Sequence, residues 1–175
     1  MAPWGGVDRL VGNNPCSWSE PAGNFPCFML DISNSAVARG KLYHVQAADK
    51  LIPEGWVLDK QGFAKTNPTH GIAGQILPMA GHKGYAISMA MDVLSGILSA
   101  CQFGSSVTGP YQKEGRSGAD HLAIVTDITK CRPIDEFNAD MESVIKTIKS
   151  SKTTPTQSEI FYPGELEERN HKRMS

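Results

Sequence analysis

The chain has 175 residues, with 17 Lys and Arg against 18 Asp and Glu, a formal net charge of −1 and 40% hydrophobic residues. This length corresponds to one domain, or one domain with an appendage, that can bury a core. The balanced charge argues against nucleic acid as a partner, because proteins that bind it usually carry an excess of Lys and Arg. No stretch reaches the roughly 18 consecutive apolar residues of a membrane span. We therefore predict a soluble protein with no membrane and no nucleic-acid partner.

The N-terminal residues lack a basic stretch followed by an apolar core, so we expect no secretory signal and a cytoplasmic location. Cys16, Cys27, Cys101 and Cys131 form no CxxC pair, which predicts free thiols rather than a zinc knuckle. There is no HExxH motif and no pair of histidines at helical ligand spacing, so we predict no metal site. Glycines and asparagines crowd the first 15 residues, as in a loop inside a domain. That density raises the hypothesis that sequence is missing upstream.

The first half of the chain predicts short strands separated by turns. Residues 1–24 have the composition of an irregular loop. The apolar run 25–32 predicts a buried strand that leads into a polar turn, and 41–48 and 56–58 predict two more strands. Residues 67–74 are expected to form a loop.

The clearest element lies between Gly84 and Cys101, where there is no proline and apolar residues fill almost every position. The exceptions recur at helical spacing, and they are Ser88, Asp92, Ser95 and Ser99. This spacing places one narrow stripe of small polar groups on a helix that is otherwise apolar all round. We therefore predict a central helix, 84–101, buried inside the domain or between subunits.

Downstream, residues 121–128 predict a strand, 134–150 a helix with one apolar face, and 160–162 a short strand. A turn at 163–165 leads into a charged C-terminal segment. Strands and helices interleave and no internal repeat is visible, so the predicted fold class is α/β.

The sequence lacks three known glycine-rich motifs, which are the Rossmann fingerprint GxGxxG, the P-loop and GxSxG. The sequence Gly81-His82-Lys83-Gly84 stands directly before the predicted helix, where free backbone N–H groups, a helix dipole and the lysine charge would favour phosphate or carboxylate. Taken by itself, the same motif is more often a tight loop with a solvated lysine.

A second polar segment follows the first predicted strand, from Asp31 through Ile32, Ser33, Asn34, Ser35 and Ala36 to Val37. Its carboxylate and short polar side chains can hydrogen-bond ribose hydroxyls or cap a helix. Capping is the commoner role of such residues. The turn Gly12-Asn-Asn-Pro15 is a third polar site, with ordinary turn chemistry as its simplest explanation.

These pieces, taken in order, resemble the malate/L-lactate dehydrogenase family, a group of NAD(P)-dependent 2-oxoacid reductases that includes ureidoglycolate, sulfolactate and diketogulonate reductases. The matching motifs are Pro3-Trp-Gly-Gly6, Gly12-Asn-Asn-Pro15, Asp31-x-x-x-Ser35, Gly40-Lys41, Pro53-x-Gly-Trp56, Asp59-x-x-Gly62, Leu77-Pro78, Gly81-His-Lys-Gly84 and Pro163-Gly-Glu165. They cover residues 3–165, nearly the whole chain. Any one of them is weak, and their order makes the resemblance specific.

The resemblance implies a non-Rossmann layered fold with a large mixed β-sheet, assembled as a homodimer. It implies an oxidoreductase that interconverts a small 2-hydroxy acid and its 2-oxo acid with NAD or NADP. Residues 1–165 would form the cofactor-binding portion and 166–175 a charged C-terminal segment. The residues expected to contact the cofactor are Asp31, Ile32, Ser33, Asn34, Ser35, Ala36, Val37, His82, Lys83, Pro163, Gly164 and Glu165.

The family also needs a histidine that donates a proton and a nearby arginine, and no matching residues are found in 1–24. The resemblance places that pair in an N-terminal segment ahead of this chain, so the catalytic residues stay unknown and little turnover is expected from the chain alone. The alternative is a non-catalytic or truncated module that keeps the fold and acts by subunit association. A phosphate-binding transferase that uses 81–84 is a third hypothesis.

Overall fold

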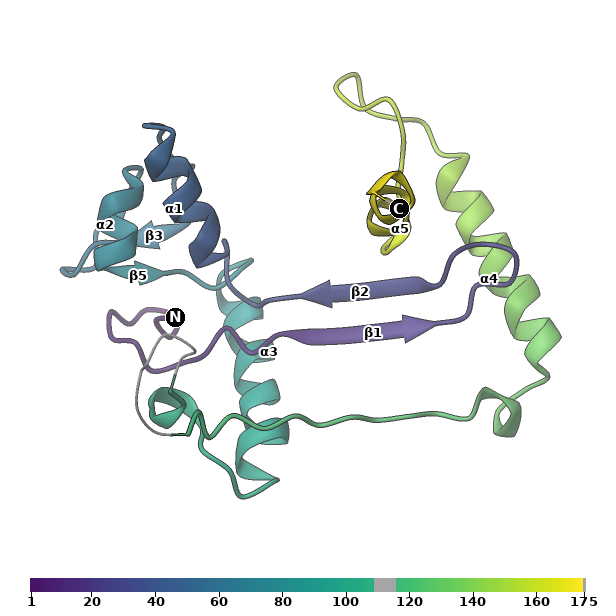
Figure 1. Ribbon diagram of the computed structural model, residues 1–175, viewed down its shortest axis with the longest axis horizontal. Coiled ribbons are helices and arrows are strands. Elements are labelled where there is room, and N and C mark those ends of the chain that lie inside the picture. The colour runs from purple at the N-terminus through teal and green to yellow at the C-terminus, as the bar shows by residue number, and fades with distance from the viewer. Residues whose placement is uncertain (109–115, 175) are drawn as a thin grey trace. The chain divides into compact units, whose positions relative to one another are not determined.

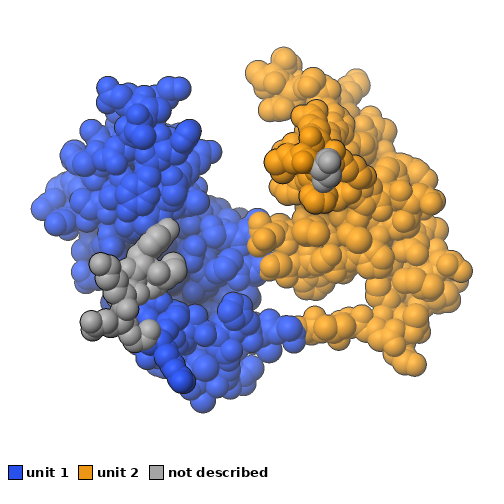
Figure 2. All heavy atoms as spheres, in the orientation of Figure 1, with its two compact units in different colours: residues 1–16, 32–123 blue, residues 17–31, 124–175 orange. Residues whose placement is uncertain are grey.

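The computed structural model describes residues 1–108 and 116–174, which form two compact units (Figure 2). Unit 1 comprises residues 1–16 and 32–123, and unit 2 comprises residues 17–31 and 124–175, within the described ranges. The chain therefore passes from one unit to the other three times. Helices and strands interleave along it, as predicted for an α/β protein (Figure 1).

Unit 1 contains a three-stranded antiparallel sheet in the order β4 (Ala64–Lys65), β3 (Val57–Leu58) and β5 (Gln75–Ile76). In it, Val57 lies opposite Lys65 and Ile76. Val57 of this sheet and Leu42 are fully buried, in a core cluster with Val37, Ile52 and Ile76. The elements of this unit are α1 (Arg39–Ala47), β3 (Val57–Leu58), β4 (Ala64–Lys65), α2 (Pro68–Ala73), β5 (Gln75–Ile76), α3 (His82–Asp92), a π-helical turn η1 (Val93–Ile97) and a 3-10 turn η2 (Gly104–Ser106).

Unit 2 has its own core, in which Ala22, Ile145 and Tyr162 are buried and Phe25, Phe28 and Met141 pack around them. Strands β1 (Cys16–Glu20) and β2 (Phe28–Ile32) form a two-stranded sheet that lies mostly in this unit. The remaining elements are a 3-10 turn η3 (Ile128–Lys130), α4 (Ile134–Lys149) and α5 (Glu165–Met174). The predicted helix 134–150 is confirmed as α4. Its residues Met141 and Ile145 pack into this core.

Several predicted elements of the first half were wrong. Residues 41–47 of the strand predicted over 41–48 belong to helix α1, and 67–74 contain helix α2 rather than a loop. Strand β1 occupies part of the stretch expected to be irregular. Strands β2 and β3 lie within the predicted ranges 25–32 and 56–58, with narrower bounds. Strand β2 is not buried as predicted, because its Met29 and Asp31 side chains are exposed.

The expected large mixed sheet is replaced, in the part of the chain that the structure describes, by sheets of two and three strands. Residues 121–127 and 160–162, both predicted as strands, have no regular structure. Ile124 and Val125 are 78% and 93% exposed. A strand needs a neighbour for its backbone hydrogen bonds, and no described segment pairs with this one.

The predicted helix 84–101 has different bounds in the structure, because α3 runs from His82 to Asp92 and a π-helical turn continues it to Ile97. Its apolar residues are not buried inside unit 1, since Ile97 and Leu98 are 51% and 69% exposed. The alternative of burial between subunits stays a prediction. The buried positions recur every four residues, and they are Gly84, Ser88, Asp92 and Gly96. The stripe of small residues is therefore the packed face of this helix.

Small residues occupy that face because backbone approaches it closely. A Cβ added at Gly84 would lie 2.2 Å from the Met79 carbonyl oxygen, and one at Gly96 would lie 2.9 Å from that of Gln102. The Ser88 hydroxyl donates to the Gly12 carbonyl oxygen at 2.9 Å. The loop 12–14 and the loop before α3 therefore pack directly against this face of the helix, which leaves no room for larger side chains on it.

Candidate functional site

The segment 31–37 leaves β2 and carries the first group of predicted cofactor residues. Asp31 is exposed and belongs to unit 2, whereas Ile32 to Val37 belong to unit 1. The hydroxyls of Ser33 and Ser35 lie 3.1 Å apart and are half-buried. Val37 is buried in the core cluster of unit 1, so the end of the segment is fixed by packing.

Asn34 is the most constrained residue of this segment, with 0% exposure. Its N–H donates to the Asn13 carbonyl oxygen at 2.8 Å, and its own carbonyl oxygen accepts from the Met79 N–H at 2.9 Å. Its side-chain Nδ2 donates to the Asn14 carbonyl oxygen at 2.6 Å, while Oδ1 is buried without a partner among the described residues. Asn34 therefore joins the loop 12–14 to the loop that precedes α3.

The same loop also pairs with the residues after Asn34. Ser35 and Pro78 form an antiparallel bridge, and the Ala36 N–H donates to the Leu77 carbonyl oxygen at 2.8 Å. Met79 is only three residues from His82. The segment 32–37 therefore lies beside residues 77–79, which lead into His82 and Lys83, so two of the three predicted groups belong to neighbouring segments of unit 1.

His82 and Lys83 are both exposed at the start of α3. The His82 ring lies edge-on to Trp4, with 6.0 Å between ring centroids, and Gly81 adopts a φ of +63° that places the turn against Trp4. The predicted supply of free N–H groups is smaller than expected. The Gly84 N–H donates to the Met79 carbonyl oxygen at 3.1 Å, and that of Lys83 to Ala80 at 3.4 Å. The attraction for an anion therefore comes chiefly from the Lys83 side chain.

The third predicted group, Pro163 to Glu165, lies in unit 2 and is seated on β2. The Met29 N–H donates to the Pro163 carbonyl oxygen at 3.0 Å. Gly164 has a φ of +95°, and a Cβ there would lie 2.9 Å from the Met29 Cβ and 3.0 Å from the Cys27 carbonyl oxygen. Only glycine fits this turn without strain or a clash with backbone.

The Glu165 carboxylate is already engaged by protein groups. Its side chain is 13% exposed, and its Oε1 lies 2.5 Å from the Lys149 Nζ and 3.2 Å from an Arg169 nitrogen. The other oxygen accepts from the Tyr162 N–H at 3.4 Å. The Glu165 carboxylate is therefore less available to a ligand than the exposed carboxylate of Asp31.

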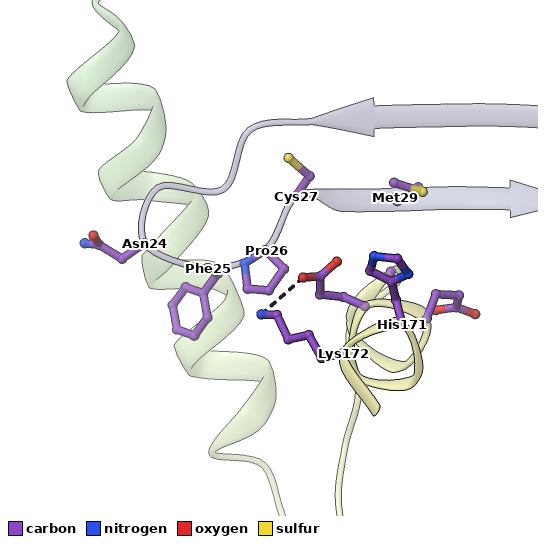
Figure 3. Close-up of a pocket in the computed structure, with 10 residues that line it drawn as sticks. Asn24, Phe25, Pro26, Cys27, Met29, His171 and Lys172 are labelled. Atoms are coloured by element: carbon purple, nitrogen blue, oxygen red, sulfur yellow. Dashed lines mark ion pairs between the residues drawn. The ribbon is translucent and has the colours of Figure 1, made fainter. Parts of the chain in front are cut away.

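A groove of about 590 Å³ borders the same turn, between the chain around β2 and helix α5 (Figure 3). Along this groove Lys172 forms an ion pair with Glu168 at 3.1 Å, which is the dashed line in Figure 3. Apolar and charged side chains mix along it, and the lining residues are Asn24, Phe25, Pro26, Cys27, Met29, Gly164, Glu167, Glu168, His171 and Lys172.

Sequence reasoning missed the importance of the loop 12–14, which it treated as a plain turn. Asn14 Nδ2 donates to the Ser88 carbonyl oxygen at 2.8 Å and lies 3.3 Å from Asp92 Oδ1, and the Gly104 N–H donates to Asp92 Oδ2 at 2.9 Å. Ser88 and Asp92 are more than 70 residues from Asn14 along the chain, so no local sequence pattern could reveal these contacts.

The described residues allow three further observations. Within residues 1–108 and 116–174, no cluster of three or more His, Cys, Asp or Glu side chains is arranged to hold a metal ion. No described helix is both long and apolar enough to cross a membrane. All four cysteines are free.

Glu159, beside the turn 163–165, gives the first prediction. Two hydrogen bonds from Arg169, assisted by Lys149, hold the pKa of Glu159 at about 2, below its usual 4.5. A carboxylate with a lowered folded-state pKa stabilises the fold above its unfolded pKa, and that stabilisation is lost as pH falls from 4.5 towards 2. We expect Glu159→Gln to be less stable than wild type at pH 6 and equally stable near pH 2.

Urea unfolding of both proteins between pH 6 and pH 2 measures this difference. Glu54→Gln, at an exposed turn position, is the matched control and should track wild type throughout. A Glu159→Gln deficit of equal size at both ends of the pH range would contradict the prediction.

Both the sequence and the structure of the chain are similar to those of known proteins. The sequence model described as malate/L-lactate dehydrogenase matches residues 1–175. Malate/(S)-sulfolactate dehydrogenase of Methanothermus fervidus is 36% identical over 173 residues, which cover 99% of this chain and 49% of that protein. (2R)-3-sulfolactate dehydrogenase (NADP(+)) of Chromohalobacter salexigens is 35% identical over 128 residues, which cover 73% of this chain and 38% of that protein.

Among solved structures, sulfolactate dehydrogenase from Methanocaldococcus jannaschii is similar with a TM-score of 0.87 and 32% identity, over 99% of this chain and 49% of that one. The fold of the described residues is therefore the fold of part of that enzyme. The chain spans about half the length of the curated relative from Methanothermus and of this solved structure.

Proposed function

Because the chain belongs to the malate/L-lactate dehydrogenase family, we propose that it is the cofactor-binding part of an NAD- or NADP-dependent oxidoreductase that interconverts a small 2-hydroxy acid and its 2-oxo acid. The observation that carries the proposal is the side-by-side placement of the segment 32–37 and the loop leading to His82 and Lys83. Two segments more than 40 residues apart thus supply one set of ligand-binding groups.

The donor set on these two segments fits a dinucleotide. Paired hydroxyls on Ser33 and Ser35 can hydrogen-bond ribose hydroxyls or an amide, and the exposed ammonium of Lys83 can bind a phosphate. Asn34 is buried and holds the segment in place rather than touching a ligand. Ile32, Ala36 and Val37 supply backbone and packing, and His82 lies exposed beside Lys83.

The remaining predicted residues have different proposed roles. Asp31 is exposed and offers a carboxylate to ribose hydroxyls. Pro163 and Gly164 contribute through the backbone of their turn, which Glu165 stabilises by its ion pairs. We assign this binding role to residues 1–165, with 166–175 as the charged C-terminal segment, of which Ser175 lies outside the described residues.

The bound cofactor would supply the hydride, and the chain's own groups would hold and orient it. We assign no proton donor and no cation for the substrate carboxylate among the described residues. The homodimer and the cytoplasmic location stay predictions.

The test is a titration of the protein with NADH and NADPH, followed by the fluorescence of the reduced nicotinamide. We expect saturable binding of at least one of them. Lys83→Met should weaken it about tenfold, because roughly 1.4 kcal/mol is lost with one charge-assisted phosphate contact. Lys60→Met, also an exposed lysine of unit 1, is the control and should bind as wild type does. Absence of saturable binding of both cofactors would contradict the proposed function.

A second candidate function is a non-catalytic module that acts by subunit association. It is favoured by the apolar residues that α3 and η1 expose, among them Val93, Ile97 and Leu98 at 44%, 51% and 69%. Contiguous exposed apolar surface of this kind marks association sites in soluble proteins. Sedimentation at high concentration tests it, and a monomer that binds no apolar dye would count against it.

A further inference from the structure

Four charged side chains of unit 2 form one connected ion-pair network around the segment 159–165. Arg169 on α5 donates two hydrogen bonds of 2.8 Å to the two oxygens of Glu159 and also lies 3.2 Å from Glu165 Oε1. Lys149, the last residue of α4, lies 2.5 Å from Glu165 and 3.5 Å from Glu159. The two positive and two negative charges thus balance, and each cation contacts both carboxylates.

One side of the network is shielded from water. The side chains of Glu165 and Lys149 are 13% and 27% exposed, whereas those of Arg169 and Glu159 are 37% and 39% exposed. The Phe161 ring lies against both cations, with 4.8 Å from its centroid to the Arg169 guanidinium and 5.9 Å to the Lys149 ammonium. Paired forks of this kind are geometrically specific, because the planar guanidinium matches a carboxylate at two points.

The network also reaches the backbone of the turn 163–165. Lys149 donates to the Ile160 carbonyl oxygen at 3.3 Å, and the Glu165 N–H donates to that of Tyr162 at 3.1 Å. Tyr162 is 2% exposed, and its hydroxyl donates to the Pro26 carbonyl oxygen at 3.0 Å. The ion pairs thus hold the Glu165 end of the turn, and the hydrogen bond from the Met29 N–H of β2 holds the Pro163 end.

We propose that Lys149 and Arg169 are positioning residues that preset the turn 163–165 for the cofactor by holding the Glu165 carboxylate. The inference rests on the proposed function, because it assigns these two cations to the turn that would contact NAD or NADP. A turn that is already ordered loses less conformational entropy when a ligand binds, which raises affinity without any new contact. Neither cation needs to touch the cofactor for this effect.

Arg169→Met tests the proposal, since it keeps the aliphatic stem and removes the guanidinium. In the protein without cofactor, we expect amide hydrogen exchange at Glu165 and Met29 to become at least about tenfold faster, with no change at Ile145 in α4. The affinity for the reduced cofactor that wild type binds should fall about fivefold, and Arg169→Lys should restore part of both effects. Lys149→Met is a second variant, for which the same pattern is expected.

The control is Arg132→Met, which removes an arginine of the same unit that pairs with Asp140 at 2.8 Å and lies outside the network. It should leave exchange at Glu165 and cofactor affinity unchanged. Unchanged exchange at Glu165 and Met29 in both Arg169→Met and Lys149→Met would overturn the proposal, whatever the cofactor does. Faster exchange with unchanged affinity would overturn the positioning role. A wild-type protein that binds neither cofactor would contradict the proposed function and this role together, and the exchange rates would still show whether the network holds the turn.

Discussion

Replacing Leu42 with alanine is expected to lower the free energy of unfolding of unit 1 by about 2–5 kcal/mol. Leu42 is 0% exposed and lies in the one cluster that also contains Val37, Val57 and Ile76. Removing its side chain loses apolar burial and leaves a cavity that α1 and the small sheet cannot fill without moving. Because Val37 ends the segment 31–37, the loss should reach the candidate site as well as the core.

Leu51→Ala is the matched control for this prediction, since Leu51 belongs to the same unit and is 73% exposed. Urea unfolding can be followed by the emission of Trp56, which packs against the cluster, after Trp4 and Trp18 have been replaced by phenylalanine. We expect a large shift of the midpoint for Leu42→Ala and almost none for Leu51→Ala. Equal shifts would mean that the cluster is not the stabilising core of unit 1.

The elements that the sequence predicted correctly are those specified locally. Helix α4 was expected over 134–150 and runs from Ile134 to Lys149. Its acidic residues Asp135 and Glu136 fall in the first turn and its lysines in the last, which suits the helix dipole. Ile145 then faces the core of unit 2. Propensity, charge and apolar spacing all favour the same structure here, so the prediction did not depend on distant contacts.

The wrong predictions arose where two local readings compete. In α1, Leu42 and Val45 are three residues apart, which suits a helix, while Tyr43 and Val45 also have high strand propensity. In α2, Asn67 caps the helix by accepting from the Thr69 N–H at 2.9 Å, and Pro68 occupies the first turn. The same Asn-Pro pair is also a turn signal, and only the tertiary packing decides between them.

The helix after Gly84 shows a different limit of sequence reasoning. Its stripe of small residues was visible, but the pattern alone could not tell which side would be buried. The decision comes from hydrogen bonds with the loop 12–14, in which Ser88 and Asp92 take part. For the candidate site, the motifs located the three segments, and the structure supplied the contacts that join two of them.

Asn34→Asp is expected to be the most damaging single substitution at the candidate site, lowering stability by about 3–5 kcal/mol at pH 7 because it places an unpaired charge in a fully buried position. Asn34 is 0% exposed, and its Nδ2 donates to the Asn14 carbonyl oxygen at 2.6 Å. The aspartate oxygen that replaces Nδ2 would face that carbonyl oxygen without a proton between them. The junction between the loop 12–14 and the loop before α3 would open, so cofactor binding should be lost together with stability.

The pH dependence of this variant identifies the cause. Burial disfavours the charged carboxylate, so the folded-state pKa of Asp at position 34 would rise above the unfolded value of about 3.9. The destabilisation should therefore be smallest below about pH 4, where the buried acid is neutral, and should grow as pH rises towards the folded-state pKa. Asn13→Asp, the same substitution at the exposed neighbouring position, is the control and should cost less than about 0.5 kcal/mol. Urea unfolding of both variants from pH 3.5 to pH 8 distinguishes the cases: a deficit of Asn34→Asp that is independent of pH would show that loss of the Nδ2 hydrogen bond, rather than buried charge, makes Asn34 necessary.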